Sequence, residues 1–372
     1  MLPRRSPQRF AWPVLVGAML LGYVVVRTLA AGPLAAFEPE AGVLSGAAVA
    51  QVASGASGGT IVVFGAPLPT TTPTNSPGAD LYGWQLTAAN VGLASVGLTC
   101  SSLPLYTGSP KPASGTVITG RRIPGSLDLS AGNITIDRSC VQPATGTIGS
   151  GLPVITTTDN NACTSAGCAV TPATVTISNS EIDGSMLSAH DAAFATGLIG
   201  IANMMNNYIH DLGSGIGLMN TGKTLDAVIE HNYITRLKAY GDGATTGNHS
   251  DGFTIRDFDA GTKPSRTVVV RNNRFDCNSG NDTGAFFIQT YAGNINNVTV
   301  TGNLLEGSGY NLGLNQDFGN TYTNVTASNN RFTPSGYGAA YVQGGLGWNS
   351  WSGNYLNDPS KGNNQGAVVP KP

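Results

Sequence analysis

The stretch Val298-Thr-Val-Thr-Gly-Asn-Leu-Leu305 contains the pattern that decides the fold. In it, apolar Val300 is followed three positions later by a polar turn residue, Asn303, and two positions after that by apolar Leu305. The same phrase occurs eight times in the chain. The copies are Ile136/Ser139/Val141, Ile177/Ser180/Ile182, Met204/Asn207/Ile209, Ile229/Asn232/Ile234, Val270/Asn273/Phe275, Val300/Asn303/Leu305, Ala327/Asn330/Phe332 and Trp351/Asn354/Leu356.

Successive turn residues lie 41, 27, 25, 41, 30, 27 and 24 positions apart. Such periods are typical of solenoids, in which each unit buries its apolar face by stacking on its neighbours. Short β-branched runs such as Val268-Val-Val270 predict strands, since no unit carries a long 3.6-residue periodicity. Asn suits the turn because it tolerates left-handed backbone. Stacked at a strand separation of about 4.8 Å, the Asn amides can also hydrogen-bond to one another along the axis.

This pattern resembles the parallel β-helix superfamily that includes pectate lyases and polygalacturonases. The resemblance implies an all-β fold, a right-handed parallel β-helix solenoid with an Asn-rich turn ladder, over residues 81–358. The handedness agrees with the rule for parallel crossovers. A second strand is expected after each turn, with alternate residues pointing inward. The expected inward pairs are Ile216/Leu218, Phe253/Ile255, Phe286/Ile288, Leu312/Leu314 and Ala340/Val342.

The N-terminal segment of the chain predicts export. Arg4, Arg5 and Arg9 precede an apolar run over residues 11–26, so residues 1–31 form either a secretory signal peptide or a retained signal anchor. Residues 32–80 are rich in Ala, Gly, Ser, Thr and Pro and predict a flexible tether, and residues 359–372 predict a flexible tail. The protein is then secreted or at the cell surface, with the membrane contacted only through the N-terminal segment.

Composition limits the partners. With 11% charged residues, 50 Gly and a net charge of −2, the chain lacks the basic stripe of a nucleic-acid binder. Five cysteines cannot all pair. Cys163 and Cys168 suit a small loop disulfide, Cys100 can meet Cys140 across coils, and Cys277 is then left over. No Cys/His spacing for zinc is present.

The second 41-residue interval holds an insertion that ends in Asn248-His-Ser-Asp-Gly252. His249 and Asp251 therefore stand at the start of a strand that also carries Arg256, and these three residues are the catalytic candidates. A lyase acting on a uronic acid needs a base for the C5 proton and positive charge for the enolate, which His249 and Arg256 can supply.

A hydrolase instead needs two carboxylates. Asp251 is one candidate, and the candidates for the other are Asp211, Asp276, Asp282 and Glu306. Stacking of coils can bring the pairs His190-Asp191 and His210-Asp211 near His249, or they are turn residues, which is the interpretation that we favour.

Outward residues of the same strands form a possible substrate platform. Aromatic rings take the apolar faces of sugars, and amides take hydroxyls or carboxylates. The alternative is that they are ordinary surface residues. The platform consists of Thr254, Phe287, Gln289, Asn315, Tyr341 and Gln343.

His249-Ser-Asp-Gly-Phe253 resembles the Asn-Thr-Asp-Gly element of polygalacturonases, which implies that Asp251 is a catalytic acid. The chain lacks that family's paired Asp, its Gly-His-Gly and its Arg-Ile-Lys elements, and also the Arg-x-Pro-x-x-Arg pattern of pectate lyases. We therefore expect a monomeric polysaccharide lyase or glycoside hydrolase acting on an extracellular polysaccharide, with acidic polysaccharides among the candidates. The alternative is a non-catalytic glycan-binding or adhesion module. No metal site is predicted, although Ca²⁺ stays open as a cofactor because β-helix lyases commonly use it.

Overall fold

The structure is a computed structural model that describes residues 81–149, 151–158, 171–261, 263–307 and 309–372, together with two short strands nearer the N-terminus. These two strands, β1 (Val49–Val52) and β2 (Thr60–Val63), pair antiparallel within a first unit that spans residues 1–74. The apolar run over residues 11–26 and the Cys163/Cys168 pair lie outside the described residues. Nowhere in the described ranges is there a helix long and apolar enough to cross a membrane.

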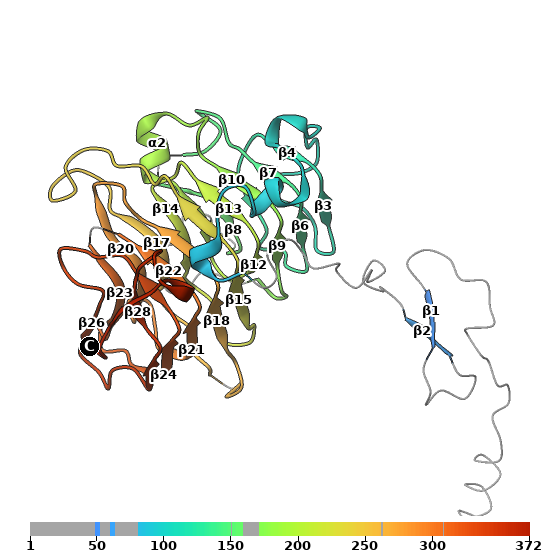
Figure 1. The fold of residues 1–372 in the computed structure, drawn as a ribbon. Coiled ribbons are helices and arrows are strands. Elements are labelled where there is room, and N and C mark those ends of the chain that lie inside the picture. Colours follow the sequence, from blue (N-terminus) through green and yellow to red (C-terminus); the bar gives the residue numbers. More distant parts are fainter. Residues whose placement is uncertain are drawn as a thin grey trace, which may run out of the picture. The chain divides into compact units, whose positions relative to one another are not determined.

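The second unit, residues 75–372, winds through three sheets whose strands are almost all parallel (Figure 1). In each coil the chain runs from a strand of sheet 1 through the polar turn into sheet 2, and then into sheet 3. Neighbouring strands within a sheet come from successive coils. The predicted fold class, an all-β parallel β-helix, is therefore confirmed.

The strands and helices have the following bounds. Sheet 1 contains β3 (Val117–Thr119), β6 (Thr135–Asp137), β9 (Thr176–Ser178), β12 (Asn203–Met205), β15 (Ala227–Glu230), β18 (Val268–Arg271), β21 (Ile295–Thr301), β24 (Tyr322–Ser328) and β27 (Ser350–Ser352). Sheet 2 contains β4 (Arg122–Ile123), β7 (Cys140–Val141), β10 (Glu181–Asp183), β13 (Tyr208–His210), β16 (Tyr233–Thr235), β19 (Arg274–Asp276), β22 (Leu304–Glu306), β25 (Arg331–Phe332), β28 (Tyr355–Asn357) and β29 (Gln365–Val368). Sheet 3 contains β5 (Leu127–Asp128), β8 (Pro153–Thr156), β11 (Thr196–Ile199), β14 (Ser214–Leu218), β17 (Ser250–Ile255), β20 (Asp282–Gln289), β23 (Tyr310–Asn315) and β26 (Ala340–Gln343). The helices are α2 (Ala189–Phe194) and the 3₁₀ turns η2 (Gly83–Gln85), η3 (Gly92–Val96), η4 (Cys100–Ser102) and η5 (Gly362–Asn364).

The polar turn residues form a continuous, buried hydrogen-bonded ladder between sheets 1 and 2. The side-chain amide of Asn207 donates to Asn232 (2.9 Å), that of Asn232 to Asn273 (2.9 Å), and the same bond continues through Asn303 and Asn330 to Asn354. The side-chain oxygen of each acceptor also accepts a hydrogen bond from the backbone amide of the ladder residue one coil earlier. The predicted amide ladder is therefore present.

The reason given for Asn at this position is partly wrong. The ladder residues do not have positive φ; the residue just before each of them does, as at Asn206 (55°), His231 (55°) and Asn272 (56°). Glycine occupies the same place at Gly302 (70°). The ladder position therefore selects Asn for its amide, and the preceding position selects residues that accept left-handed backbone.

The core is a continuous apolar column inside the three sheets. The predicted inward pairs of sheet 3 stack in register, with Ile216 beside Phe253, Phe253 beside Phe286 and Phe286 beside Leu312. All of these are buried, whereas Ala340 and Val342 in the last coil are only partly buried because no further strand covers them. This inner packing and the strand register hold the backbone of sheet 3, from which the outward side chains project.

The segment over residues 81–106 runs back along the outside of sheet 2 (cyan in Figure 1). The backbone amide of Gly83 donates to the carbonyl of Gly302 (2.9 Å), and that of Gly92 donates to the carbonyl of Asn206 (3.0 Å). At its far end, Cys100 forms a disulfide with Cys140 of β7, a pairing that the sequence allowed but did not fix. Cys277 is buried and is the cysteine that this pairing leaves over.

The interval between Ser139 and Ser180 contains β8, which supplies a strand of sheet 3. One sequence expectation differs from the structure. The expected flexible tail over residues 359–372 contains β29, which pairs antiparallel with β28, and Val369 is buried and accepts a hydrogen bond from the indole of Trp351. The end of the chain therefore caps sheet 2.

Candidate active site

The loop before β17 brings His249 to the start of a sheet 3 strand. Asn248 is buried and fixes the end of this loop. Its side chain accepts a hydrogen bond from the amide of Tyr240 (2.8 Å) and donates to the carbonyl of Lys238 (2.8 Å). Strand β17 then pairs in parallel with β14 and β20, so the residues that follow Asn248 are held by both neighbours.

A cleft of about 290 Å³ lies on the outer face of sheet 3. It is lined by His249, Asp251, Arg256, Thr283, Phe287, Gln289, Asn315 and Tyr341. The structure therefore brings together the three catalytic candidates and four of the six platform residues. Thr254 is buried between them and does not line the cleft, and Gln343 is exposed on the last strand, outside it.

Asp251 is largely buried, with 14% of its side chain exposed. Its Oδ2 lies 3.5 Å from Nη2 of Arg256, and its Oδ1 has no hydrogen-bond partner among the described residues. Burial raises the pKa of Asp251 because the charged form is poorly solvated, and this outweighs the opposite effects of Arg256 and His249. Asp251 therefore keeps its proton to a higher pH than an ordinary aspartate does.

Arg256 is held from several sides. Its Nη1 donates a hydrogen bond to Oε1 of Gln289, whose Nε2 in turn donates to Asp317 (3.4 Å). The ring of Tyr291 lies 5.6 Å from the guanidinium carbon. A planar cation oriented in this way suits a carboxylate, which it can bind through two parallel hydrogen bonds.

His249 and Tyr341 offer two groups that can exchange protons. The imidazole of His249 is exposed, and its Nδ1 lies 3.2 Å from Oγ1 of Thr283 on the next coil. The ring of Tyr341 packs on Tyr310 (4.4 Å between centroids) and Phe287 (6.0 Å). Burial raises the pKa of Tyr341 to about 12, so its phenol stays protonated at neutral pH.

A second cleft of about 460 Å³ shares His249 and Thr283 with the first. Its other lining residues are Asp242, Gly243, Ala244, Gly280, Asn281, Asp282, Gly309, Tyr310 and Tyr337. Thr283, Tyr310 and Tyr337 were not predicted for the site, because nothing in the repeat pattern separates them from other residues at or just before the starts of the sheet 3 strands.

Of the candidate second carboxylates, only Asp282 lines either cleft. In the sheet, Asp282 is the register partner of Ser250, directly before Asp251. The others are engaged on sheet 2. Asp276 accepts a hydrogen bond from Thr235 (2.8 Å), and Glu306 pairs with Arg274 (2.6 Å). Asp211 pairs with His210, Arg236 and Lys238.

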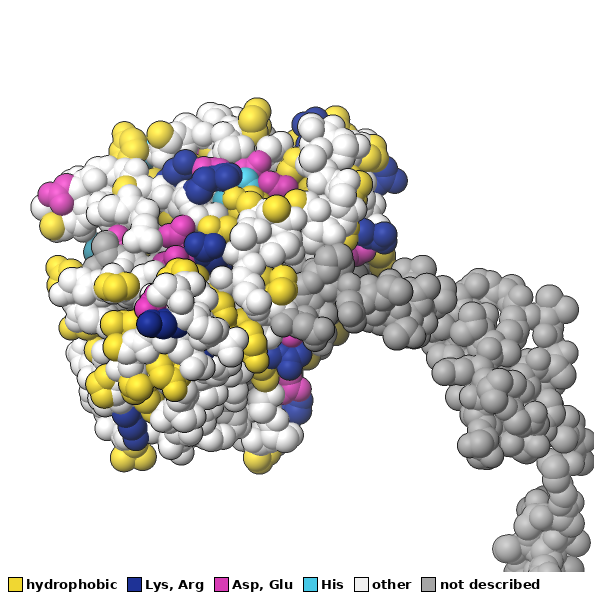
Figure 2. Space-filling model, viewed as in Figure 1, with side chains coloured by type: hydrophobic (Ala, Val, Ile, Leu, Met, Phe, Trp, Pro, Cys, Tyr) yellow, Lys and Arg dark blue, Asp and Glu magenta, His cyan; other side chains and the backbone are white. Residues whose placement is uncertain are grey.

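A network of charged groups lies on sheet 2, where Figure 2 shows basic, acidic and histidine side chains gathered over β10 and β13. His210 is buried, with Nε2 2.7 Å from Glu181 and Nδ1 2.8 Å from Asp211. Arg236 and Lys238 also pair with Asp211 (2.5 and 2.6 Å). Burial opposes the charge of His210, but its hydrogen bonds to Asp211 and Glu181 outweigh burial and raise its pKa.

The interpretation of the two His-Asp pairs as turn residues is only partly right. Asp211 has left-handed backbone (φ 58°) after the end of β13. His190 and Asp191 instead lie in helix α2, where the hydroxyl of Ser188 caps the amide of Asp191 (3.1 Å). The ring of His190 lies 5.0 Å from that of Tyr240, so α2 supports the loop that carries His249.

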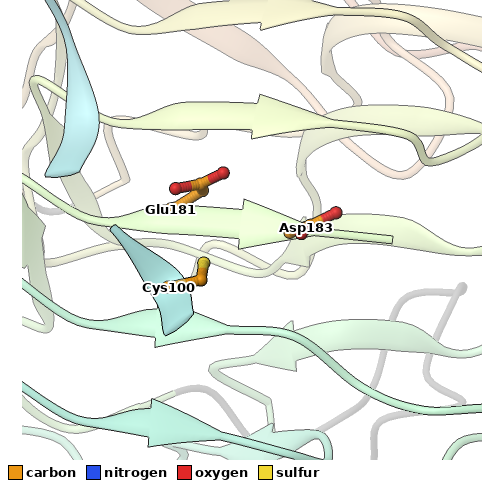
Figure 3. Close-up of side chains that lie close together, drawn as sticks. All are labelled: Cys100, Glu181 and Asp183. Carbon is orange, nitrogen blue, oxygen red and sulfur yellow. The ribbon is translucent and has the colours of Figure 1, made fainter. Parts of the chain in front are cut away.

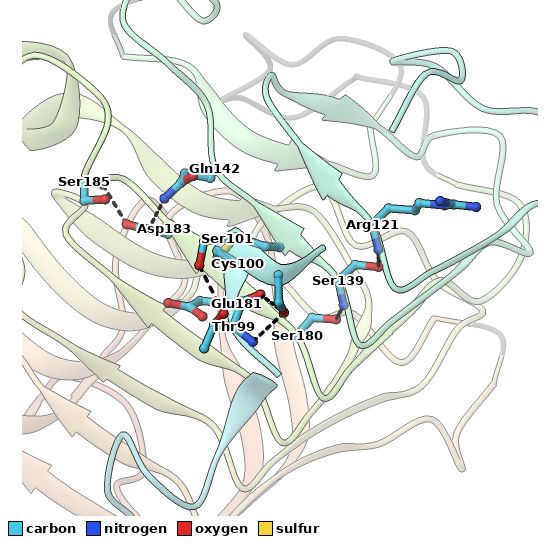
Figure 4. Close-up of a disulfide and its surroundings, with 12 residues drawn as sticks. Thr99, Cys100, Ser101, Arg121, Ser139, Gln142, Ser180, Glu181, Asp183 and Ser185 are labelled. Carbon is cyan, nitrogen blue, oxygen red and sulfur yellow. Dashed lines mark hydrogen bonds between the residues drawn. A yellow bond between two sulfur atoms is a disulfide. The ribbon is translucent and has the colours of Figure 1, made fainter. Parts of the chain in front are cut away.

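Two groups of side chains could in principle hold a metal ion. In the first, Cys100 lies near Glu181 and Asp183 of β10 (Figure 3). Its sulfur is used in the disulfide, and Asp183 accepts a hydrogen bond from Gln142 at 2.6 Å (Figure 4). The second is Asp183, His210 and Asp211, and the carboxylate oxygens of Asp211 already bind Arg236 and Lys238. Neither group adjoins the sheet 3 cleft, to which the described residues contribute a single carboxylate, Asp251.

Comparisons with protein-family models, with curated proteins and with solved structures gave no match. The function is therefore argued from the geometry of the cleft.

Proposed function

We propose that this protein is an exported polysaccharide lyase that cleaves a uronic acid-containing glycan by β-elimination. The observation that carries the proposal is the composition of one cleft. An oriented arginine, a histidine, a protonated tyrosine and two amide side chains meet there around one carboxyl group whose pKa is raised. The resemblance of the coil pattern to pectate lyases and polygalacturonases supports the same class of substrate.

Each group has a chemical task in this reaction. Arg256, with the amide of Asn315, binds the carboxylate of the uronic acid and stabilises the enolate formed from it. His249 takes the C5 proton, the C4–O bond breaks as the C4–C5 double bond forms, and Tyr341 donates its proton to the leaving oxygen.

Asp251 fits this scheme in its protonated form. A charged carboxylate beside Arg256 would repel an anionic substrate, whereas a protonated one can donate a hydrogen bond to it. The Oδ1 of Asp251 is buried without a partner among the described residues, and the exposed part of its side chain lines the cleft, where such a bond can form.

A glycoside hydrolase is the second candidate. It is favoured by Asp282, which lines the adjoining cleft, and by the likeness of His249-Ser-Asp-Gly-Phe253 to the polygalacturonase element. In that reaction Asp251, with its raised pKa, is the general acid and Asp282 is the base or nucleophile. The non-catalytic glycan-binding module is the third candidate and uses the same platform without bond cleavage.

Export is supported by the disulfide between Cys100 and Cys140, since such bonds persist in oxidising compartments. Residues 1–31 are proposed to direct the chain there as a signal peptide or anchor. We propose an extracellular polysaccharide as the partner of a monomeric protein.

The test is a screen of uronic-acid polysaccharides with two readouts, ultraviolet absorbance of unsaturated products and formation of reducing ends. The proposal predicts both signals. Reducing ends without absorbance would establish the hydrolase, and binding without either signal would establish the glycan-binding module.

Variants then test the site. His249→Ala is expected to lower kcat at least about 100-fold, as for loss of a general base, with an unchanged melting temperature. Asp251→Asn keeps a hydrogen-bond donor, so the lyase should lose only about tenfold in kcat/KM, whereas a hydrolase would lose nearly all activity. Asp358→Asn, after β28 on sheet 2, is the matched control and should not affect either rate.

A further inference from the structure

Aromatic residues gather at both ends of the sheet 3 strands, on either side of the cleft. At the start of the strands, Tyr310 opens β23 and Tyr337 precedes β26, with ring centroids 5.8 Å apart. At the end of the strands, Tyr291 follows β20 and Phe318 follows β23, with centroids 4.8 Å apart. Because neighbouring strands are parallel and in register, one pair lies where the sheet 3 strands begin and the other lies where they end.

Both pairs are open to solvent. Tyr337 is 70% exposed, Phe318 is 62% exposed and Tyr291 is 46% exposed. Single exposed apolar residues need no explanation, but paired rings on either side of a polar cleft are unusual for a solvent-facing surface. Rings in such positions can stack on the apolar faces of sugars.

The two clefts join these pairs into one path. The larger cleft contains Tyr310 and Tyr337 and meets the smaller one at His249 and Thr283. The smaller cleft ends at Arg256, whose guanidinium lies 5.6 Å from the ring of Tyr291. The path follows the strand direction. With a rise of about 3.3 Å per residue, β20 alone gives it a length of about 23 Å, enough for several sugar units.

A glycan that lay along the solenoid axis would meet fewer strands and aromatic side chains beyond the cleft. Towards the C-terminus, only β23 and β26 follow β20 before sheet 3 ends. Towards the N-terminus, the outward row continues from Thr254 to Gly217 and Ile199, which present no ring. A glycan along the axis would therefore leave both aromatic pairs unused.

We infer that the bound glycan lies across sheet 3, parallel to its strands. The sugars on one side of the cleavage point stack on Tyr310 and Tyr337, and those on the other side stack on Tyr291 and Phe318. The inference rests on the proposed function and adds the direction of the chain and the residues that set its minimum length.

The test uses uronic-acid oligosaccharides of defined length, labelled at the reducing end, with Tyr337→Ala and Phe318→Ala. Each variant should lower kcat/KM about tenfold on long oligosaccharides and leave the shortest cleavable substrate unaffected. The two variants should shift the cleavage position towards opposite ends of the labelled chain, because each removes contacts on one side only.

Two exposed or partly exposed apolar residues serve as controls. Met219 follows β14, one coil before Arg256 along the axis, and Leu346 follows β26 and is 90% exposed. Met219→Ala and Leu346→Ala should leave kcat/KM and product lengths unchanged. If they alter product lengths while Tyr337→Ala and Phe318→Ala do not, the glycan runs along the axis and the inference is overturned, although the proposed function stands. If the wild-type protein neither cleaves nor binds any uronic-acid glycan, the inference and the proposed function are both refuted. Melting temperatures of all four variants should match the wild type.

Discussion

Replacing one amide in the middle of the buried ladder gives the most direct test of how the coils are held together. Asn273 is fully buried, and its Oδ1 accepts from both the backbone and side-chain amides of Asn232 (2.9 Å each). Its Nδ2 donates to the carbonyl of Ile229 (2.8 Å) and to Asn303 (3.0 Å). The change Asn273→Ala removes all of these bonds at once.

The magnitude follows from the groups left behind. The backbone amide of Asn232 and the carbonyl of Ile229 each lose a buried partner, and an unsatisfied buried polar group costs about 1–3 kcal/mol. The free energy of unfolding should therefore fall by about 2–6 kcal/mol, a large part of the stability of an ordinary domain. Asn273→Ser should lose less, because at the equivalent position the hydroxyl of Ser180 accepts a hydrogen bond from the amide of Ser139 (3.1 Å).

Urea denaturation followed by circular dichroism measures these differences, with hydrogen exchange locating the coils that open. Asn349→Ala is the control, since Asn349 is exposed and should change the free energy of unfolding by less than about 0.5 kcal/mol. If Asn273→Ala were no more destabilising than Asn349→Ala, the ladder would be a consequence of the fold rather than a source of its stability.

Two further predictions concern sheet 2. The pKa of His210 is raised above its ordinary value of 6.5, so its stabilising effect is fully present below that pH and is lost as the pH rises through the folded pKa. The free energy of unfolding should thus decline on this alkaline side, and His210→Gln should flatten the profile; an unchanged slope would argue against an imidazolium between Glu181 and Asp211. Cys140→Ser opens a loop with a sequence separation of 40 residues and should cost about 4 kcal/mol, read as a lower melting temperature together with faster proteolysis of residues 81–106. Unchanged proteolysis would mean that non-covalent contacts alone hold that segment.

Periodic features of this protein are well predicted from its sequence. The ladder positions and the inward pairs repeat in every coil, so each copy supports the interpretation of the others, and the register of Phe253 with Phe286 follows directly. Part of the cleft lining could be predicted from the sequence for the same reason. Once alternation assigns Phe287 and Gln289 to the outer face, their neighbours on adjacent strands follow from the stacking of coils.

Other features depend on contacts that no local pattern encodes. Tyr310 begins β23 and Tyr337 lies in the loop before β26, and their approach depends on the lengths of the loops that precede these two strands. Burial of His210 between Glu181 and Asp211 depends on which side chains sheet 2 aligns. The short C-terminal strand β29 has little periodicity of its own and is ordered by pairing with β28.

The route of residues 81–106 has a consequence for the order of assembly. The segment is synthesised before every coil that it touches, yet Gly83 binds Gly302, and the guanidinium of Arg274 donates to the carbonyl of Leu86 (2.9 Å). Its disulfide partner, Cys140, belongs to an early coil. During vectorial synthesis the segment can therefore dock only progressively, from Cys100 back towards Gly83, as successive coils stack. The seating of Gly83 marks a chain whose coils have formed at least as far as Gly302, so the segment reports that the solenoid has grown to this coil.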